Sequence, residues 1–115
     1  MKLSCIYIYS NPVERLHFLQ ILKHFPEITL KAEFSDAVNA NEYLNYNAVD
    51  FAIVCSELPV CDGFDFVKQL KDNIEIILLT KDPMDAIRSY EMGFIDCLLK
   101  PVNQERLKSS IERLV

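Results

Sequence analysis

The sequence predicts one α/β domain over residues 1–115, built as a doubly wound, five-stranded parallel sheet with helices on both faces. Short apolar runs of strand length alternate with amphipathic segments along the whole chain, and no linker or low-complexity segment interrupts them. One run, Phe51–Cys55, is apolar at every position, which is typical of a strand buried on both faces. Because crossovers between parallel strands are right-handed, this alternation favours a single parallel sheet.

The predicted strands differ in how deeply they should be buried. The run at 51–55 and the run at 74–79, which ends at Thr80, should lie inside the sheet. Apolar and charged residues alternate over 29–34, so we place this strand at an edge with one face exposed. The remaining strands are expected at residues 3–9 and 97–99.

Capping signals mark the predicted helices. Asn11 precedes Pro12, and Asp82 precedes Pro83, each with an acid soon after, a pattern that predicts an N-cap followed by proline in the first turn. Gly93 should end the fourth helix, because glycine favours the left-handed turn at a C-terminus. The other three helices should begin at Ser35-Asp36, Asp62-Gly63 and Asn103.

Composition and charge exclude several classes of function. Half of the residues are hydrophobic and 25% are charged, as in a soluble globular domain. No apolar run reaches the roughly 20 residues that span a bilayer, and no secretory signal opens the chain, so we expect a cytoplasmic location without membrane contact. The net charge of −5, with acids and bases interspersed, argues against direct binding of nucleic acid. The four cysteines form no CxxC pair and have no metal-type spacing.

The central stretch, AVDFAIVCSELPVCDGF, resembles the phosphoacceptor strand and loop of bacterial response-regulator receiver domains. In that family an aspartate ends the strand, a proline follows, and an Asp-Gly pair comes soon after. Pro59 and Asp62-Gly63 stand in this register, and the residue at the acceptor position is Cys55. The chain thus resembles a receiver whose nucleophile is missing.

The C-terminal part carries the most specific resemblance. IILLTKDPMDAIRSYEMGFIDCLLKPVNQERL looks like the fourth strand through the fifth helix of receivers that precede LytTR-type DNA-binding domains. Thr80 matches the hydroxyl residue that hydrogen-bonds the phosphoryl group, and Lys100, followed by Pro101, matches the lysine that pairs with it. The resemblance covers the whole chain and implies the strand order 2-1-3-4-5, which agrees with a second strand at the edge.

Other positions depart from the family pattern. Tyr9 and Ser10 replace the adjacent acids that hold Mg²⁺ in receivers, and Cys97 replaces the switch aromatic. Lys81 follows Thr80, where a small residue usually leaves room for the phosphoryl group. Because Mg²⁺ requires oxygen ligands that usually include carboxylates, we expect no metal site, no cofactor, no catalytic residue and no phosphoryl transfer.

Three expectations concern the surroundings of these residues. Tyr90 is expected in the core rather than as a substitute for the switch aromatic. The ammonium of Lys100 is expected to find carbonyls, the Thr80 hydroxyl or water as partners. The acids at the helix starts are expected to serve only as caps that complement the helix dipole. They are Asp62, Asp65, Asp82 and Asp85.

These observations favour a degenerate receiver, a pseudo-receiver, that acts through protein contacts in a LytTR-like transcription regulator. It would bind a protein partner or form a homodimer through its fourth helix, fifth strand and fifth helix. The charges expected on that face are Arg88, Glu91, Lys108 and Glu112.

Two other hypotheses remain open at this point. Cys55 could be a thiol redox switch, because a nearby Lys100 would lower its pKa. Alternatively, Ser56 or Glu57 could accept the phosphoryl group in place of aspartate. The alternation of side chains along a strand disfavours this, because it turns Ser56 away from the pocket that Cys55 faces.

Overall fold

The strands and helices alternate along the chain, and the computed structural model describes residues 2–115. The strands are β1 (Leu3–Ile8), β2 (Ile28–Phe34), β3 (Phe51–Cys55), β4 (Glu75–Thr80) and β5 (Asp96–Leu99). The helices are α1 (Pro12–Leu22), α2 (Ala37–Tyr46), α3 (Gly63–Lys68), α4 (Asp85–Glu91) and α5 (Gln104–Leu114).

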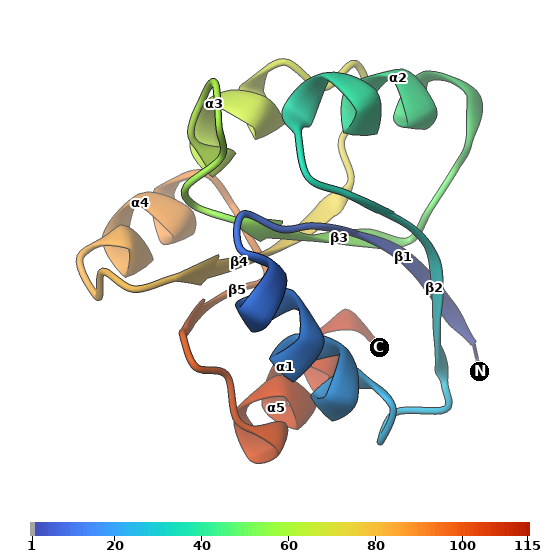
Figure 1. Ribbon diagram of the computed structural model, residues 1–115, viewed down its shortest axis with the longest axis vertical. Helices are drawn as coiled ribbons and strands as arrows, with labels where there is room; N and C mark the ends of the chain where they lie inside the picture. The colour runs from blue at the N-terminus through green and yellow to red at the C-terminus, as the bar shows by residue number, and fades with distance from the viewer. Residues whose placement is uncertain (1) are drawn as a thin grey trace.

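The strands form one parallel sheet in the order β2-β1-β3-β4-β5, which confirms the predicted class and strand order. The half-polar strand β2 lies at an edge, as its sequence pattern predicted. Helices α1 and α5 cover one face of the sheet, and α2 and α3 cover the other (Figure 1). No helix within residues 2–115 is long and apolar enough to cross a membrane.

Strand β3 supplies both hydrophobic cores. Phe51, Ile53 and Cys55 pack on the side of α1 and α5, whereas Ala52 and Val54 pack on the side of α2 and α3. All five side chains are buried, which explains why this strand is apolar at every position. The alternation also fixes the direction of the residue at the acceptor position, which faces α1 and α5.

Most helix starts agree with the predicted caps, but α4 begins later than expected. The Asn11 and Asn103 side chains accept hydrogen bonds from backbone N–H groups in the first turns of α1 and α5. Asp82 instead accepts from the N–H of Met84 at 2.9 Å and forms a separate turn. Helix α4 therefore starts at Asp85, and its N-cap makes no side-chain hydrogen bond.

Helix α4 is terminated by Gly93 as predicted, but the side chains near its end are not buried as expected. Gly93 adopts φ of 77°, and the N–H groups of Gly93 and Phe94 bond to the carbonyls of Tyr90 and Ser89, which is a Schellman arrangement. The expectation that Tyr90 lies in the core is wrong, since this residue is 85% exposed. The neighbouring Ser89 is buried instead, and its hydroxyl donates to the Asp85 carbonyl.

A buried carboxylate at the start of β5 connects the sheet to α5. Asp96 accepts two hydrogen bonds from the Arg106 guanidinium, at 2.7 and 2.9 Å, and one from the Ser110 hydroxyl at 2.7 Å. The backbone N–H of Cys97 donates a further bond at 2.8 Å. Burial alone would raise the pKa of Asp96, but these hydrogen bonds outweigh it and lower the pKa to about 2.

This arrangement predicts a loss of stability in acid. The folded pKa of Asp96 lies below the ordinary value of 3.8, so its contribution is present above that value and disappears as the pH falls toward about 2. The contribution at neutral pH is about 2 kcal/mol, at about 1.4 kcal/mol per pKa unit. Urea unfolding of Asp96→Asn should give a lower free energy of unfolding at neutral pH and a smaller decrease on acidification. The exposed Asp72→Asn control should match the wild type, and an equal acid response in all three proteins would contradict this account.

Candidate functional site

The loop after β3 is held in place by backbone contacts. The Gly63 N–H donates to the Ser56 carbonyl at 2.7 Å, and a Cβ at Gly63 would lie 2.5 Å from the Cys55 carbonyl oxygen. Only glycine permits this approach. The Asp62 side chain accepts from the N–H of Asp65, so it caps α3 as predicted. Pro59 lies exposed within the loop. Gly63 and Asp62 therefore fix the path of the backbone from β3 into α3.

Cys55 ends β3 at the carboxyl edge of the sheet and is 1% exposed. Burial raises the pKa of its thiol, and the opposing effects of Lys100 and Ser10 are smaller. The thiol also contributes, after burial, to a raised pKa of the adjacent Tyr7. A redox-sensing thiol needs access to solvent and a lowered pKa. Cys55 has neither property, so the structure offers no support for the redox hypothesis.

The positions that hold Mg²⁺ in receivers have a different role here. The Tyr9 ring contacts the ring of Tyr7, with 5.8 Å between centroids, and the Arg15 guanidinium lies 5.5 Å from the Tyr9 ring centroid. Arg15 also pairs with Glu33 of β2, so Tyr9 belongs to a cluster that joins β1, α1 and β2. Tyr9 is thus a packing residue, whereas Ser10 borders the Cys55 thiol.

The donor set does not fit Mg²⁺. A phenol, a hydroxyl and a thiol, from Tyr9, Ser10 and Cys55, stand where this ion needs carboxylate oxygens. Within residues 2–115, no three His, Cys, Asp or Glu side chains form a group that could hold a metal ion.

Lys100 has a carboxylate partner that the sequence did not predict. Its Nζ lies 2.9 Å from Oε2 of Glu14, so the expectation of carbonyl, Thr80 or water partners was wrong. The Lys81 Nζ lies 3.2 Å from the other carboxylate oxygen. Burial would raise the pKa of Glu14, but hydrogen bonds from Lys100 and Lys81 outweigh it and lower the pKa. One acid from α1 therefore serves two lysines from the ends of β4 and β5.

The sequence pattern indicates only one role for Glu14, that of an acid in the first turn of α1, and the structure confirms this role. Its second role depends on where α1 crosses the carboxyl edge of the sheet. The Lys100 side chain is 9% exposed, so its charge needs a partner, and α1 supplies one.

Thr80 is engaged by a different acid. Its hydroxyl donates to Oδ2 of Asp85 at 2.6 Å and accepts from the Ser56 hydroxyl and the Asp82 N–H, each at 3.1 Å. Asp85 is therefore more than the helix cap that the sequence predicted. The Lys100 N–H donates to the Thr80 carbonyl at 2.8 Å, so the two residues are adjacent in the sheet. Their side chains nevertheless bind acids from α1 and from α4, respectively.

The proposed contact face includes one residue with partners inside the chain. The Arg88 guanidinium lies 4.1 Å from the Phe64 ring centroid and 3.7 Å from an Asp62 oxygen, so it connects α4 to α3. At the switch position Cys97 is half-buried, and burial raises the pKa of its thiol. The other predicted charges on this face are exposed. They are Glu91, Lys108 and Glu112.

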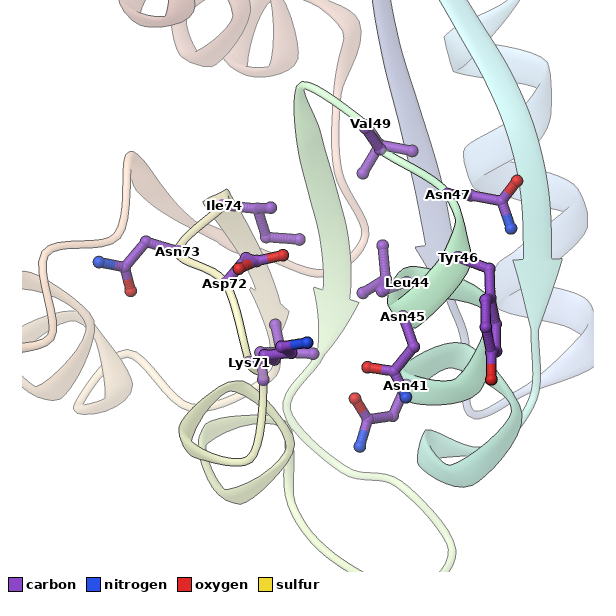
Figure 2. Close-up of a pocket in the computed structure, with 12 residues that line it drawn as sticks. Asn41, Leu44, Asn45, Tyr46, Asn47, Val49, Lys71, Asp72, Asn73 and Ile74 are labelled. Carbon is purple, nitrogen blue, oxygen red and sulfur yellow. The ribbon is translucent and has the colours of Figure 1, made fainter.

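A separate hollow of about 420 Å³ lies at the opposite, amino edge of the sheet, between the end of α2 and the loop before β4 (Figure 2). Leu44, Val49 and Ile74 line it together with several asparagines. None of the residues predicted for the receiver site lines this hollow.

Comparison with known proteins decides the family. The sequence profile described as "Response regulator receiver domain" matches residues 11–112, which is most of the chain. The chain belongs to the response regulator receiver family. This family serves two-component signal transduction, and the receiver relatives include transcriptional regulators. The profile match begins just after Tyr9 and Ser10, the positions that lack the acids.

The individual relatives have low sequence identity, but those described below match nearly the whole of this chain. An uncharacterized response regulatory protein of Vibrio cholerae is 24% identical over 98% of this chain and 48% of its own length. The sensory transduction protein LytR of Staphylococcus saprophyticus is 24% identical over 97% of this chain and 45% of its own. The chain thus spans about half the length of these relatives. The response regulatory domain of mrkE from Klebsiella pneumoniae shares the fold, with a TM-score of 0.85 at 18% identity over 96% of this receiver and 93% of that chain.

The ion pair of Glu14 and Lys100 leads to a stability prediction. Glu14→Gln should lower the free energy of unfolding by about 1–3 kcal/mol, because it leaves a poorly hydrated ammonium without its counter-charge. Adding Lys100→Met should restore part of the loss, since no unpaired charge then remains. Chemical denaturation of the two single variants and the double variant measures this coupling. Glu27→Gln, an exposed change beyond α1, is the control, and additive losses in the double variant would contradict the pairing.

Proposed function

We propose that this receiver is a phosphorylation-independent signalling module of a LytTR-type transcription regulator in the cytoplasm. The observation that carries the proposal concerns the two residues that match the phosphate-binding positions of receivers. Each of them binds a different acid of this chain. Lys100 binds Glu14 and Thr80 binds Asp85, while a buried thiol occupies the acceptor position. The module has no catalytic role of its own.

The chemistry of phosphoryl transfer supports this proposal. The reaction needs a bound cation, an oxygen nucleophile and positive groups that meet at the transferred phosphoryl group. Ser56 is an unsuitable nucleophile because it is buried and its hydroxyl donates to Thr80. Glu57 is exposed in the loop after β3, and no group of metal-ligating side chains within residues 2–115 would hold a cation beside it. No observation favours either residue or a redox-active Cys55.

An apolar surface on α4 and β5 supports a role in protein contacts. Three apolar residues recur at every third position and are exposed: Met84 at the N-cap of α4, and Ile87 and Tyr90 within this helix. Leu99 is exposed on β5. A shallow hollow of about 400 Å³ beside Leu99 continues this surface toward α5. Contiguous exposed apolar groups of this kind typically mark a contact site.

We propose that a second copy of this chain covers the surface in a two-fold dimer. A two-fold interface must be complementary to itself. Helix α4 carries Arg88 and Glu91, and α5 carries Lys108 and Glu112, so each helix offers both signs of charge. Such exposed pairs contribute roughly 0–1 kcal/mol each, so they set orientation while the apolar residues supply affinity.

The regulator context rests on the relatives. LytR is described as a sensory transduction protein, and this chain matches about half of it. With a net charge of −5, this domain would leave DNA contacts to another part of the regulator.

Phosphorylation of the domain can be tested directly. Incubation with acetyl phosphate and Mg²⁺ should add no phosphoryl group by intact mass, and millimolar Mg²⁺ or beryllofluoride should not change the amide spectrum. Cys55→Asp alone should not restore the reaction, because Tyr9 and Ser10 still lack carboxylates. The triple variant with Tyr9→Asp and Ser10→Asp is the minimal one expected to bind Mg²⁺. Phosphate found on any residue of the wild-type domain would overturn the proposed function.

The proposed dimer can be tested by a substitution on α4. Tyr90→Lys should weaken association about tenfold in sedimentation experiments, because it places a charge in the apolar surface. Tyr46→Lys on α2 is the matched control, since Tyr46 is 84% exposed but lies away from this face. Arg88 is a poorer probe because it packs on Phe64 and Asp62 within the chain. A wild-type domain that stays monomeric at high micromolar concentration would contradict the proposed dimer.

A further inference from the structure

A cavity of about 330 Å³ lies between α1 and the loops that follow β4 and β5. Its walls are mainly apolar and include Val13 and Phe18 of α1 and Val102 after β5. At the carboxyl edge of a parallel sheet such a cavity is well placed for a ligand, and its size is within the range of small-molecule sites. No residue of α4 lines it, although Pro101 lines both this cavity and the hollow beside Leu99.

The charged groups of the cavity are a carboxylate and two ammonium groups. Glu14, Lys81 and Lys100 all line it, and the two lysines share the one acid. This leaves one unit of positive charge at the cavity. Tyr9, Ser10 and Cys55 carry no ordinary charge at neutral pH, and none of the three lines the cavity.

The side chains of the two lysines differ in solvent exposure. The Lys100 side chain is 9% exposed and is held between the strand end and Glu14, whereas the Lys81 side chain is 66% exposed. Lys81 can therefore turn toward a second anion at small cost, while Lys100 offers a fixed and poorly hydrated charge. His17 also borders the cavity and adds no negative charge.

We propose that this cavity binds a small organic carboxylate, with its apolar body against Val13, Phe18 and Val102 and its carboxylate at the ammonium groups of Lys81 and Lys100. The apolar walls favour an organic anion over inorganic phosphate, which would leave them exposed to water. The single surplus charge matches a monoanion. The inference does not depend on whether the domain is phosphorylated.

Titration of the ¹⁵N-labelled domain with phenylacetate tests this proposal. We expect shifts of the amide signals at residues 13–18 and 79–81 and at Lys100 and Val102. Phenylacetamide should bind about tenfold more weakly, because it keeps the ring but lacks the charge. Lys81→Gln should weaken phenylacetate about tenfold, whereas Lys108→Gln, an exposed change on α5, should leave binding unchanged.

A second pair of variants tests the position of the ligand. Val13→Glu adds a negative charge at the cavity and should abolish binding, whereas Val38→Glu should not. The two valines are the second residues of α1 and α2 and are 76% and 70% exposed, so both variants should fold.

Four results would overturn the proposal. One is equal binding of phenylacetate and phenylacetamide, and a second is an equal effect of each variant and its control. A third is tighter binding of inorganic phosphate than of phenylacetate. The fourth is failure of phenylacetate, benzoate and hexanoate alike to shift the cavity signals at millimolar concentration. None of these results bears on phosphorylation, so the two proposals fail independently.

Discussion

A buried ammonium needs an opposite charge, and this requirement at Lys100 organises the carboxyl edge of the sheet. Transferring a charge from water is costly unless it is paired. The three acids that surround this lysine in the receiver pattern are absent here, so the pairing comes from Glu14 on α1 at 2.9 Å. The contact joins the first turn of α1 to the residue after β5. Lys81 pairs with the same carboxylate, so these three side chains determine the charge of the adjacent cavity.

Side chains of the chain itself also connect the other strands to their helices. The receiver position Thr80 connects β4 to the first residue of α4 through Asp85, and Asp96, which is not a receiver position, connects β5 to α5 through Arg106. Gly63 lets the loop after β3 pass close to the Cys55 carbonyl. These contacts connect β4 to α4 and β5 to α5 and fix the loop after β3. Lys100 and Thr80 thus belong to two separate intramolecular pairs, with Glu14 and with Asp85.

The sequence was a good guide where local chemistry decides structure. The fully apolar run of β3, the Asn11 cap and the Gly93 stop each predicted an element that the structure contains. It failed at Tyr90 because the apolar stripe of α4 faces outward, whereas a periodic pattern is usually assigned to the core. It missed Glu14 because side chains 86 residues apart meet only after the sheet has formed.

The position of the counter-charge on α1, rather than at the end of β3, affects how this chain would respond to regaining the receiver acids. Without Glu14, the buried Lys100 would lose the carboxylate that now pairs with it. An aspartate introduced at position 55 would lie near a Lys100 that already binds Glu14, so the two carboxylates would compete for the Lys100 ammonium while Lys81 remains close to Glu14. Restoring the receiver pattern therefore requires changes at several positions together.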